Sequence, residues 1–395
     1  DTDRSRGLGD VYKRQDLHMT KSAIQTKFPY RYDVVGSLLR TQALKDAHAK
    51  FNAGQINAAD LQKVQHEETR KIVDKQVELG LKDITDGEFN RSWWHLDFLW
   101  GLTGVEKYDY HKSYKFHGSK TRTDNAELSG KIAFNPAHPF FDSFEFLESI
   151  TPDGVTPKQT IPSPTMLFRD NRSDNWSKFY DTWDQYLDDV AKAYHETILH
   201  FYELGARYVQ LDDTTWAFLI SKLNETADDP KAHAKYVKLA EDSVKVINKL
   251  LADLPDDLTV TTHICRGNFK STFLFSGGYD DVADYLGQLN YDGLFLEYDS
   301  ERAGDFSPLG KIWNGDKNKR IVLGLITSKS PELEDKDAVI NRINQASSKV
   351  PLENLALSTQ CGFASTEEGN KLTEQQQWNK LKLVRDIARE VWDVD

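Results

Sequence analysis

The chain contains 395 residues, of which 39% are hydrophobic and 28% are charged, and its formal net charge at pH 7 is −12. A chain of this length can form two or three domains, or one large barrel that carries insertions. The 9 Trp, 16 Tyr and 20 Phe exclude a largely disordered chain, because disordered sequences are poor in aromatic residues.

Charge and composition also narrow the range of partners. The acidic excess argues against nucleic acid as the main partner, because binding to phosphates requires a basic face. No stretch approaches the roughly 18 consecutive apolar residues of a membrane helix, so we expect no membrane partner. Two cysteines cannot form a disulfide framework, which favours a reducing compartment and therefore the cytoplasm.

Residues 1–18 are expected to be a disordered leader that is not native to the protein. They mix both signs of charge with Gly7 and Gly9, and they lack the apolar segment of a secretory signal. Met19 is a candidate native start. We therefore expect a single domain over residues 19–395.

The first half of the chain is predicted to be less regular than the second. Residues 34–37 and 81–88 have the pattern of barrel strands. Residues 101–160 are polar, contain Gly and Pro, and predict a long excursion over one end of the fold. Excursions of that length usually belong to the active-site face.

In the second half, short apolar runs alternate with helical patterns. The expected strands cover residues 206–211, 258–263, 293–297, 320–326 and 355–358, and the expected helices cover 231–253, 279–288, 335–348 and 373–392. Such alternation predicts parallel strand–helix–strand units and an α/β fold. Because no GxGxxG motif follows the first strand, a (β/α)8 TIM barrel is favoured over a dinucleotide-binding sheet.

Both cysteines lie just beyond predicted strands, Cys265 two residues after His263, and Cys361 after the strand 355–358. Residues two apart in an extended segment point to the same side, so His263 and Cys265 can face one point. Glu297 ends another of these strands, and the strand ends of a barrel converge on one mouth. One imidazole, two thiolates and a carboxylate make a four-ligand set that suits Zn²⁺.

The same four residues also fit a structural interpretation. Both cysteines can be small buried hydrophobic residues, with His263 a hydrogen-bonded core histidine and Glu297 a surface acid. The spacing alone leaves both interpretations open, because His-x-Cys is a short pattern. The position of all four groups at the same end of successive strands favours the metal site.

Six short sequence runs resemble segments of the C-terminal catalytic barrel of cobalamin-independent methionine synthase, and they occur in the same order as in that family. The resemblance extends over about residues 28–392, and the ordered His-x-Cys, Glu and Cys set is its most specific part. There is no room for the N-terminal barrel of that family, so the chain is similar to a short, single-barrel branch. The runs cover residues 35–40, 86–91, 209–213, 263–265, 295–297 and 360–363.

The resemblance implies a zinc ion bound by His263, Cys265, Glu297 and Cys361. It also implies a homocysteine pocket in which Glu88 and Asp212 bind the α-ammonium group and Ser37 binds the α-carboxylate. Coordination to zinc would hold the substrate thiol as a thiolate, which is the nucleophilic form. For the pocket residues, hydrogen bonding within the barrel, or a Gly-Ser turn at Ser37, is the alternative.

The site of the methyl donor departs from the family pattern at three positions. Arg169, next to Phe168, aligns with the expected Trp of the pterin platform, and Lys120 replaces the arginine of a Gly-Ser-Arg contact. Lys329 aligns with the proton-donating His of the family, and a lysine is a poor general acid unless its site lowers its pKa. Trp93 and Trp94 are further candidates for stacking on a flat donor, although aromatic clusters are more often core.

These observations predict a zinc-dependent enzyme that methylates homocysteine to methionine. The donor is expected to be 5-methyltetrahydrofolate, as its polyglutamate, or a methyl-corrinoid protein. Two alternatives stay open at this point. One is a metal-free barrel lyase that resembles uroporphyrinogen decarboxylase, and the other is a non-catalytic zinc- or homocysteine-binding homologue.

Overall fold

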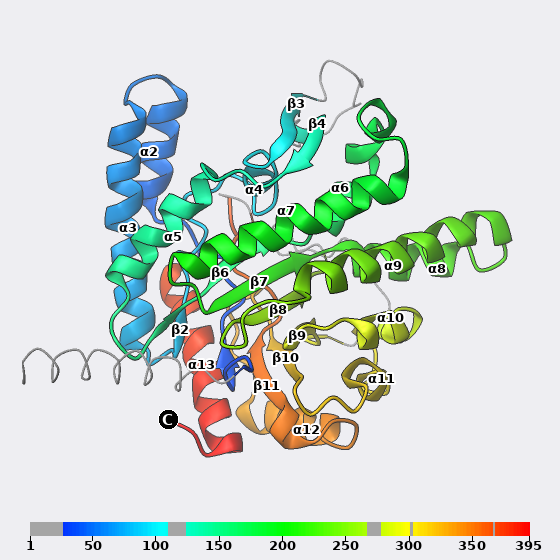
Figure 1. Cartoon of the computed structure of the whole chain (residues 1–395). Helices are drawn as coiled ribbons and strands as arrows, with labels where there is room; N and C mark the ends of the chain where they lie inside the picture. Colours follow the sequence, from blue (N-terminus) through cyan, green and yellow to red (C-terminus); the bar gives the residue numbers. More distant parts are fainter. Residues whose placement is uncertain (1–26, 110–123, 267–277, 301–302, 366–367) are drawn as a thin grey trace, which may run out of the picture.

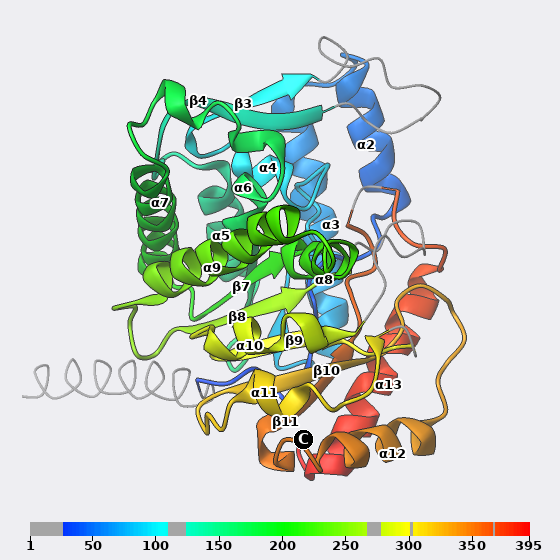
Figure 2. The same cartoon turned by 90° about the vertical axis from the view of Figure 1, so that its right-hand side faces the viewer.

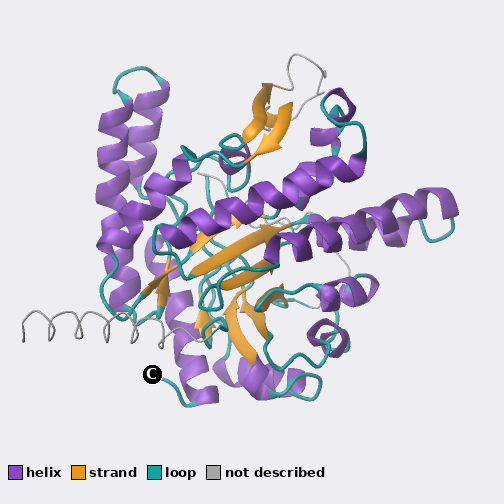
Figure 3. Cartoon of the chain, in the orientation of Figure 1, coloured by secondary structure: helices purple, strands orange, loops and turns teal. Residues whose placement is uncertain are grey.

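The computed structural model describes residues 27–109, 124–266, 278–300, 303–365 and 368–395. The predicted leader, residues 1–18, lies outside the described residues. Strands occupy the centre of the molecule and helices surround them, as Figures 1 and 3 show. Within the described ranges, no helix combines the length and the apolar character needed to cross a membrane.

Parallel strands form the wall of the barrel. Their order in the main sheet is β1-β11-β10-β9-β8-β7-β6, and β2 pairs with β5. Lys158 alone separates β5 from β6, so these two are halves of one bent strand that joins the two sheets. The strands are β1 (Tyr32–Asp33), β2 (Asp83–Ile84), β5 (Thr156–Pro157), β6 (Gln159–Pro162), β7 (Tyr208–Asp213), β8 (Thr259–Ile264), β9 (Gly293–Glu297), β10 (Arg320–Ile326) and β11 (Leu355–Thr359).

The barrel closes between β1 and β2. These two strands are joined by hydrogen bonds between the residues that follow them, and not by regular backbone pairing between the strands. Thr85 Oγ1 donates to the carbonyl of Gly36 at 2.7 Å, and the Leu38 N–H donates to the carbonyl of Gly87 at 3.1 Å. On the other side of β1, Tyr32 pairs with Leu357 of β11. The predicted α/β barrel is therefore confirmed.

Helices cover the outside of the wall. Capping boxes begin α3, α7 and α13, in which a side chain at each end of the first turn satisfies a free backbone N–H. The helices are α2 (Gln42–Asn52), α3 (Ala58–Glu78), α4 (Leu96–Leu99), α5 (Pro139–Ile150), α6 (Thr165–Phe168), α7 (Trp183–Glu203), α8 (Thr215–Glu225), α9 (Pro230–Leu251), α10 (Ala283–Gln288), α11 (Leu309–Trp313), α12 (Lys336–Ala346) and α13 (Glu374–Trp392).

The excursion after β2 contains an antiparallel hairpin of β3 (Thr103–Asp109) and β4 (Asp124–Ala133), followed by α5. The hairpin stands above the barrel beside α7, and the α2–α3 pair rises on another side (Figures 1 and 2). The excursion is shorter than predicted, because β5 begins at Thr156 and β6 at Gln159. The hairpin follows the carboxyl end of β2, which is the end where the active sites of such barrels lie.

Predicted and observed strands agree best in the second half. The predictions 293–297 and 320–326 coincide with β9 and β10. In the first half, β1 ends at Asp33, so residues 34–37 follow the strand rather than form it. Of the predicted strand 81–88, only Asp83–Ile84 is β-structure.

Candidate metal centre and substrate pocket

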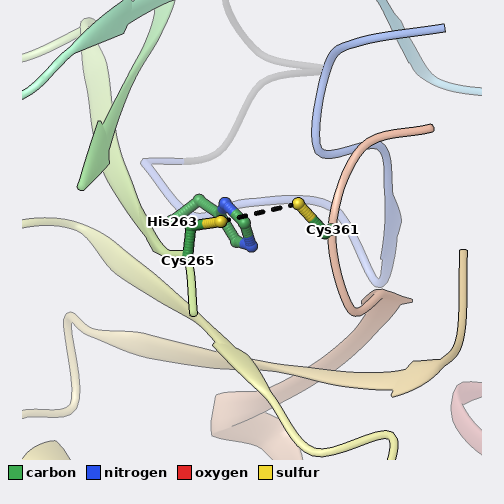
Figure 4. A group of neighbouring side chains, drawn as sticks. All are labelled: His263, Cys265 and Cys361. Carbon is green, nitrogen blue, oxygen red and sulfur yellow. Dashed lines mark hydrogen bonds between the residues drawn. The ribbon is translucent and has the colours of Figure 1, made fainter. Parts of the chain in front are cut away.

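Three possible metal ligands meet at the carboxyl ends of the barrel strands. His263 belongs to β8, Cys265 follows it directly, and Cys361 follows β11 from the opposite side (Figure 4). One ligand atom from each residue lies within 4.8 Å of the others, and the two Sγ atoms are 3.7 Å apart. All three residues are buried. The structure thus brings together three of the four groups that the sequence placed at one end of the barrel.

Glu297, the fourth predicted ligand, ends β9 and reaches the edge of this cluster. Its Oε1 lies 4.0 Å from His263 Nε2. Both carboxyl oxygens are buried and make no hydrogen bond within the described part of the chain. Burial raises the pKa of Glu297 well above its ordinary value, and the neighbouring Cys265 raises it further. A buried carboxyl group without hydrogen bonds needs a proton or a cation beside it.

His263 is held in place from two sides. Its Nε2 lies 2.9 Å from the carbonyl oxygen of Gln360, and its Nδ1 lies 3.9 Å from Asp212 Oδ1. Burial lowers the pKa of His263 from 6.5 to about 4. The ring is therefore neutral at physiological pH, which is the form that binds a metal.

This shift gives a testable pH dependence. In the metal-free protein, the His263 ring should stay uncharged as the pH falls from 7 to 5 and should gain a proton only near pH 4. Long-range ¹H–¹⁵N NMR measures the protonation state of the ring, and a His263→Gln variant assigns its signals. A midpoint near the ordinary value of about 6.5 would contradict the burial described for this ring.

The donor set fits a zinc ion. Two cysteine sulfurs, one neutral imidazole and one unsatisfied carboxylate are the ligand types of a tetrahedral zinc site. In the absence of a metal, the hydrogen bond between the thiols and their burial raise the pKa of Cys361 well above its ordinary value. A bound cation reverses this effect, because it stabilises the thiolate form.

Asp212 and Glu88, two of the predicted homocysteine residues, both lie at the barrel mouth. Asp212 is the strand neighbour of His263, since the two residues are paired in register between β7 and β8. Burial raises the pKa of both carboxyl groups, and the proximity of Glu88 raises that of Asp212 further. Two acidic groups buried close together are suited to a cationic ligand, which would offset their repulsion.

The backbone at Glu88 is held in an unusual conformation. Its φ angle is +64°, a left-handed value that residues other than glycine adopt only at a cost. The Arg40 guanidinium donates to its carbonyl at 2.8 Å, and Asp86 Oδ1 accepts from its N–H at 2.8 Å. Glu88 Oε1 lies 3.3 Å from Arg91, whereas Oε2 is buried without a hydrogen bond among the described residues. This arrangement holds the carboxylate in place while one of its oxygens stays unengaged.

Ser37 lies against the loop that carries Cys361. Its Oγ accepts from the Ala364 N–H at 3.1 Å, and its carbonyl accepts from the Phe363 N–H at 2.9 Å. A Cβ atom at Gly362 would lie 2.0 Å from Ser37 Oγ, so this close approach requires glycine. No described residue accepts a hydrogen bond from this hydroxyl, so its proton is left to donate to a ligand.

The residue predicted to donate a proton and the residues predicted to bind the methyl donor lie in different parts of the structure. Lys329 follows β10, and its ammonium donates to Asp299 Oδ2 after β9. The backbone N–H of Trp94 donates to the carbonyl of Ser365 at 3.1 Å, beyond Cys361, and the rings of Trp93 and Trp94 pack around His95. Lys120 lies outside the described residues.

Phe168 and Arg169 border a cavity of about 590 Å³ between α6, α7, α8 and α9. Trp183 and Phe218 also line it, and Arg169 Nη1 donates to Thr214 Oγ1 at 2.7 Å. Within the described chain, the lining does not include the histidine and cysteines of the metal cluster. The cavity is therefore beside the mouth of the barrel and not at the cluster itself.

Two glutamines have contacts in the site that the sequence did not single out. The Gln360 carbonyl holds the His263 ring, and its side-chain Oε1 accepts from Ser328. Gln210 Nε2 donates to Asp212 Oδ1 at 2.8 Å. Side chains alternate between the two faces of a strand, so Gln210 and Asp212 of β7 share one face. This pattern could have indicated Gln210 from the sequence.

The fold and the cluster define a (β/α)8-barrel protein with a thiol-rich candidate metal centre. Residues 174–390 match the model of the cobalamin-independent synthase catalytic domain. The uncharacterized protein YxjH of Bacillus subtilis strain 168 is 49% identical over 378 residues, which cover 94% of this chain and 97% of YxjH. The chain belongs to the cobalamin-independent methionine synthase family, so the resemblance predicted from the sequence is confirmed.

Two further relatives extend the comparison. A crystal structure from Listeria monocytogenes, described as a candidate vitamin-B12-independent methionine synthase, is 40% identical and has a TM-score of 0.74. It aligns over 93% of this chain and 99% of that one. The 5-methyltetrahydropteroyltriglutamate–homocysteine methyltransferase of Listeria welshimeri is 21% identical over 90% of this chain but only 42% of its own length. This chain thus corresponds to part of that longer enzyme.

Proposed function

We propose that this protein transfers a methyl group to the sulfur of homocysteine, with a zinc ion held by His263, Cys265, Glu297 and Cys361. One observation carries the proposal: two cysteine sulfurs 3.7 Å apart lie beside a neutral histidine and a buried carboxylate that makes no hydrogen bond with the described residues. Membership of the cobalamin-independent synthase family supports this reading over a metal-free lyase. The name of the Listeria welshimeri relative supports homocysteine as the acceptor.

When bound, zinc would supply a Lewis acid that holds the substrate thiol as a thiolate at neutral pH. The protein residues bind and orient the rest of the amino acid. Asp212 and Glu88 would accept hydrogen bonds from the α-ammonium group, and the Ser37 hydroxyl and N–H would donate to the α-carboxylate. Burial of this pocket excludes water, which strengthens these charged contacts.

We assign the methyl donor to 5-methyltetrahydrofolate, with a polyglutamate tail. The printed name of the Listeria welshimeri relative supports a folate of this kind. Phe168, Arg169, Trp93 and Trp94 are the candidate contacts for its flat ring, at the border of the cavity and beside the loop of Cys361. Lys329, whose ammonium contacts Asp299, is the candidate proton donor to the leaving amine.

A donor-resolved assay tests this function. The protein is purified without chelator, its zinc is measured, and it is given homocysteine with methyltetrahydrofolate, its triglutamate or methylcobalamin. We expect about one zinc per chain and methionine from the folates, with the activity lost on treatment with chelator and restored by zinc. Activity that survives metal removal would exclude the zinc role, and methionine from methylcobalamin alone would reassign the donor. No methionine from any donor would instead favour a non-catalytic binder.

A further inference from the structure

A series of buried hydrogen bonds connects the interior of the barrel with Asp212. It starts at Lys158, whose side chain has no exposed surface. The ammonium donates to Asp33 Oδ1 at 2.9 Å, to Gln210 Oε1 at 2.8 Å and to the carbonyl of Val34. A lysine has three N–H donors and no acceptor, so these contacts use its full capacity.

The lysine determines which way the Gln210 amide points. Because Lys158 can only donate, the carbonyl oxygen of the amide must face it. The NH₂ group then faces the opposite way, where Nε2 donates to the Val35 carbonyl at 2.6 Å and to Asp212 Oδ1 at 2.8 Å. Both amide donors and the amide oxygen are therefore engaged, and the flipped orientation would oppose donor to donor.

The geometry of β7 makes this connection possible. Residues two apart on a strand share a face, so Tyr208, Gln210 and Asp212 form one row on the inner face of the barrel. Tyr208 anchors the far end of the row, because its hydroxyl donates to Asp33 Oδ2 at 2.8 Å. The row extends from the Asp33–Lys158 pair to the carboxyl end of the strand, where the candidate site lies.

The contacts of Asp212 are one-sided as a result. Both neighbours of its carboxylate, Gln210 Nε2 at 2.8 Å and His263 Nδ1 at 3.9 Å, are on Oδ1. We infer that Gln210 is a positioning residue, which holds the Asp212 carboxylate in the orientation that receives the α-ammonium group of an amino-acid substrate. This inference rests on the proposed function, which assigns that group to Asp212. A carboxylate held in advance loses less conformational freedom when the substrate binds.

The test compares two ligands that differ only in the α-amino group. Homocysteine and 4-sulfanylbutanoate both carry a thiol and a carboxylate, but only homocysteine has the ammonium group that Asp212 would bind. Isothermal titration calorimetry measures the Kd of each for the zinc-loaded full chain. Gln210→Met removes the hydrogen-bond donor to Asp212 and keeps a side chain of similar length. If this variant does not fold, Gln210→Glu is used instead, because it removes the same donor but keeps an acceptor for Lys158.

In each variant we expect the Kd of homocysteine to rise about tenfold, because the Asp212 carboxylate must then be ordered when the substrate binds. The Kd of 4-sulfanylbutanoate should stay within about twofold of the wild-type value. In turnover assays, KM for homocysteine should rise more than kcat falls. Gln159→Met is the matched control, because this buried neighbour of Lys158 donates to Thr160 and should leave both affinities unchanged.

Three results would overturn the inference. Unchanged homocysteine affinity in whichever variant folds would show that Gln210 does not orient Asp212. Equal weakening of both ligands would indicate an effect on the zinc centre or on folding. Failure of the wild-type protein to bind homocysteine would reject the proposed function, and the inference would fall with it. The first two outcomes leave wild-type binding intact, so the two failures are distinguishable.

Discussion

Replacing Cys361 with serine is expected to remove zinc binding and methyl transfer together while the barrel stays folded. Cys361 supplies one of the two sulfurs, 3.7 Å from Cys265. A serine hydroxyl is a much weaker zinc ligand than a thiolate. Because changes in residues that merely support metal ligands cost 10- to 100-fold, loss of a ligand should lower activity by more than about 100-fold.

Metal analysis, the methionine assay and circular dichroism measure the three quantities in parallel. Cys265→Ser should behave in the same way, since it removes the other sulfur. Ser243→Ala, which alters a buried hydroxyl on α9 away from the mouth, is the control and should keep both zinc and activity. Full zinc occupancy and full activity in Cys361→Ser would remove this residue from the metal centre.

Lys158→Met is expected to lower the free energy of unfolding by about 3–5 kcal/mol. Lys158 and Asp33 are both fully buried and form an ion pair at 2.9 Å, with Asp83 at 3.6 Å. Removal of the lysine leaves the Asp33 carboxylate without its counter-charge inside the barrel. Burial and the charge of Asp33 raise the pKa of Asp83 well above its ordinary value, so a second negative charge beside Asp33 is already unfavourable.

Urea unfolding followed by circular dichroism measures this change, provided the slope with denaturant is the same for both proteins. The double variant Asp33→Asn with Lys158→Met should recover part of the loss, because it removes the unpaired carboxylate. Lys71→Met is the contrasting control, since this lysine is largely exposed and should leave stability nearly unchanged. A loss below about 1 kcal/mol in Lys158→Met would show that this ion pair does not stabilise the barrel.

The second half of the fold was predictable because its strands are buried on both faces. β9 and β10 are nearly unbroken apolar runs in the sequence, and helices such as α9 and α12 are long enough to show their period. β1 and β2 have only two residues each, so the predicted strand 34–37 begins after β1 and the predicted strand 81–88 is longer than β2. The α2–α3 pair and α7 were not predicted, although α3 and α7 begin with capping boxes that are visible in the sequence.

Some residues of the candidate site were likewise predictable from the sequence, whereas others were not. The positions of Cys265 and Cys361 after strand ends predicted that they face one mouth, and their sulfurs lie 3.7 Å apart. Lys158 shows the opposite case. The sequence places it only within the predicted excursion 101–160, whereas the structure buries it completely beside Asp33 and Gln210, which are 125 and 52 residues away.

The sequence by itself determined the barrel class, the family and the clustering of His263, Cys265 and Cys361 at one end of the barrel, because these depend on local periodicity and on short ordered motifs. Tertiary structure alone decided how the acids of the site are oriented. The Asp33–Lys158–Gln210–Asp212 connection joins β1, the bent strand β5–β6 and β7, and its hydrogen bonds exist only once the sheet has curled and closed. Such contacts depend on distances of about 3 Å between side chains far apart in the chain, which no local pattern encodes.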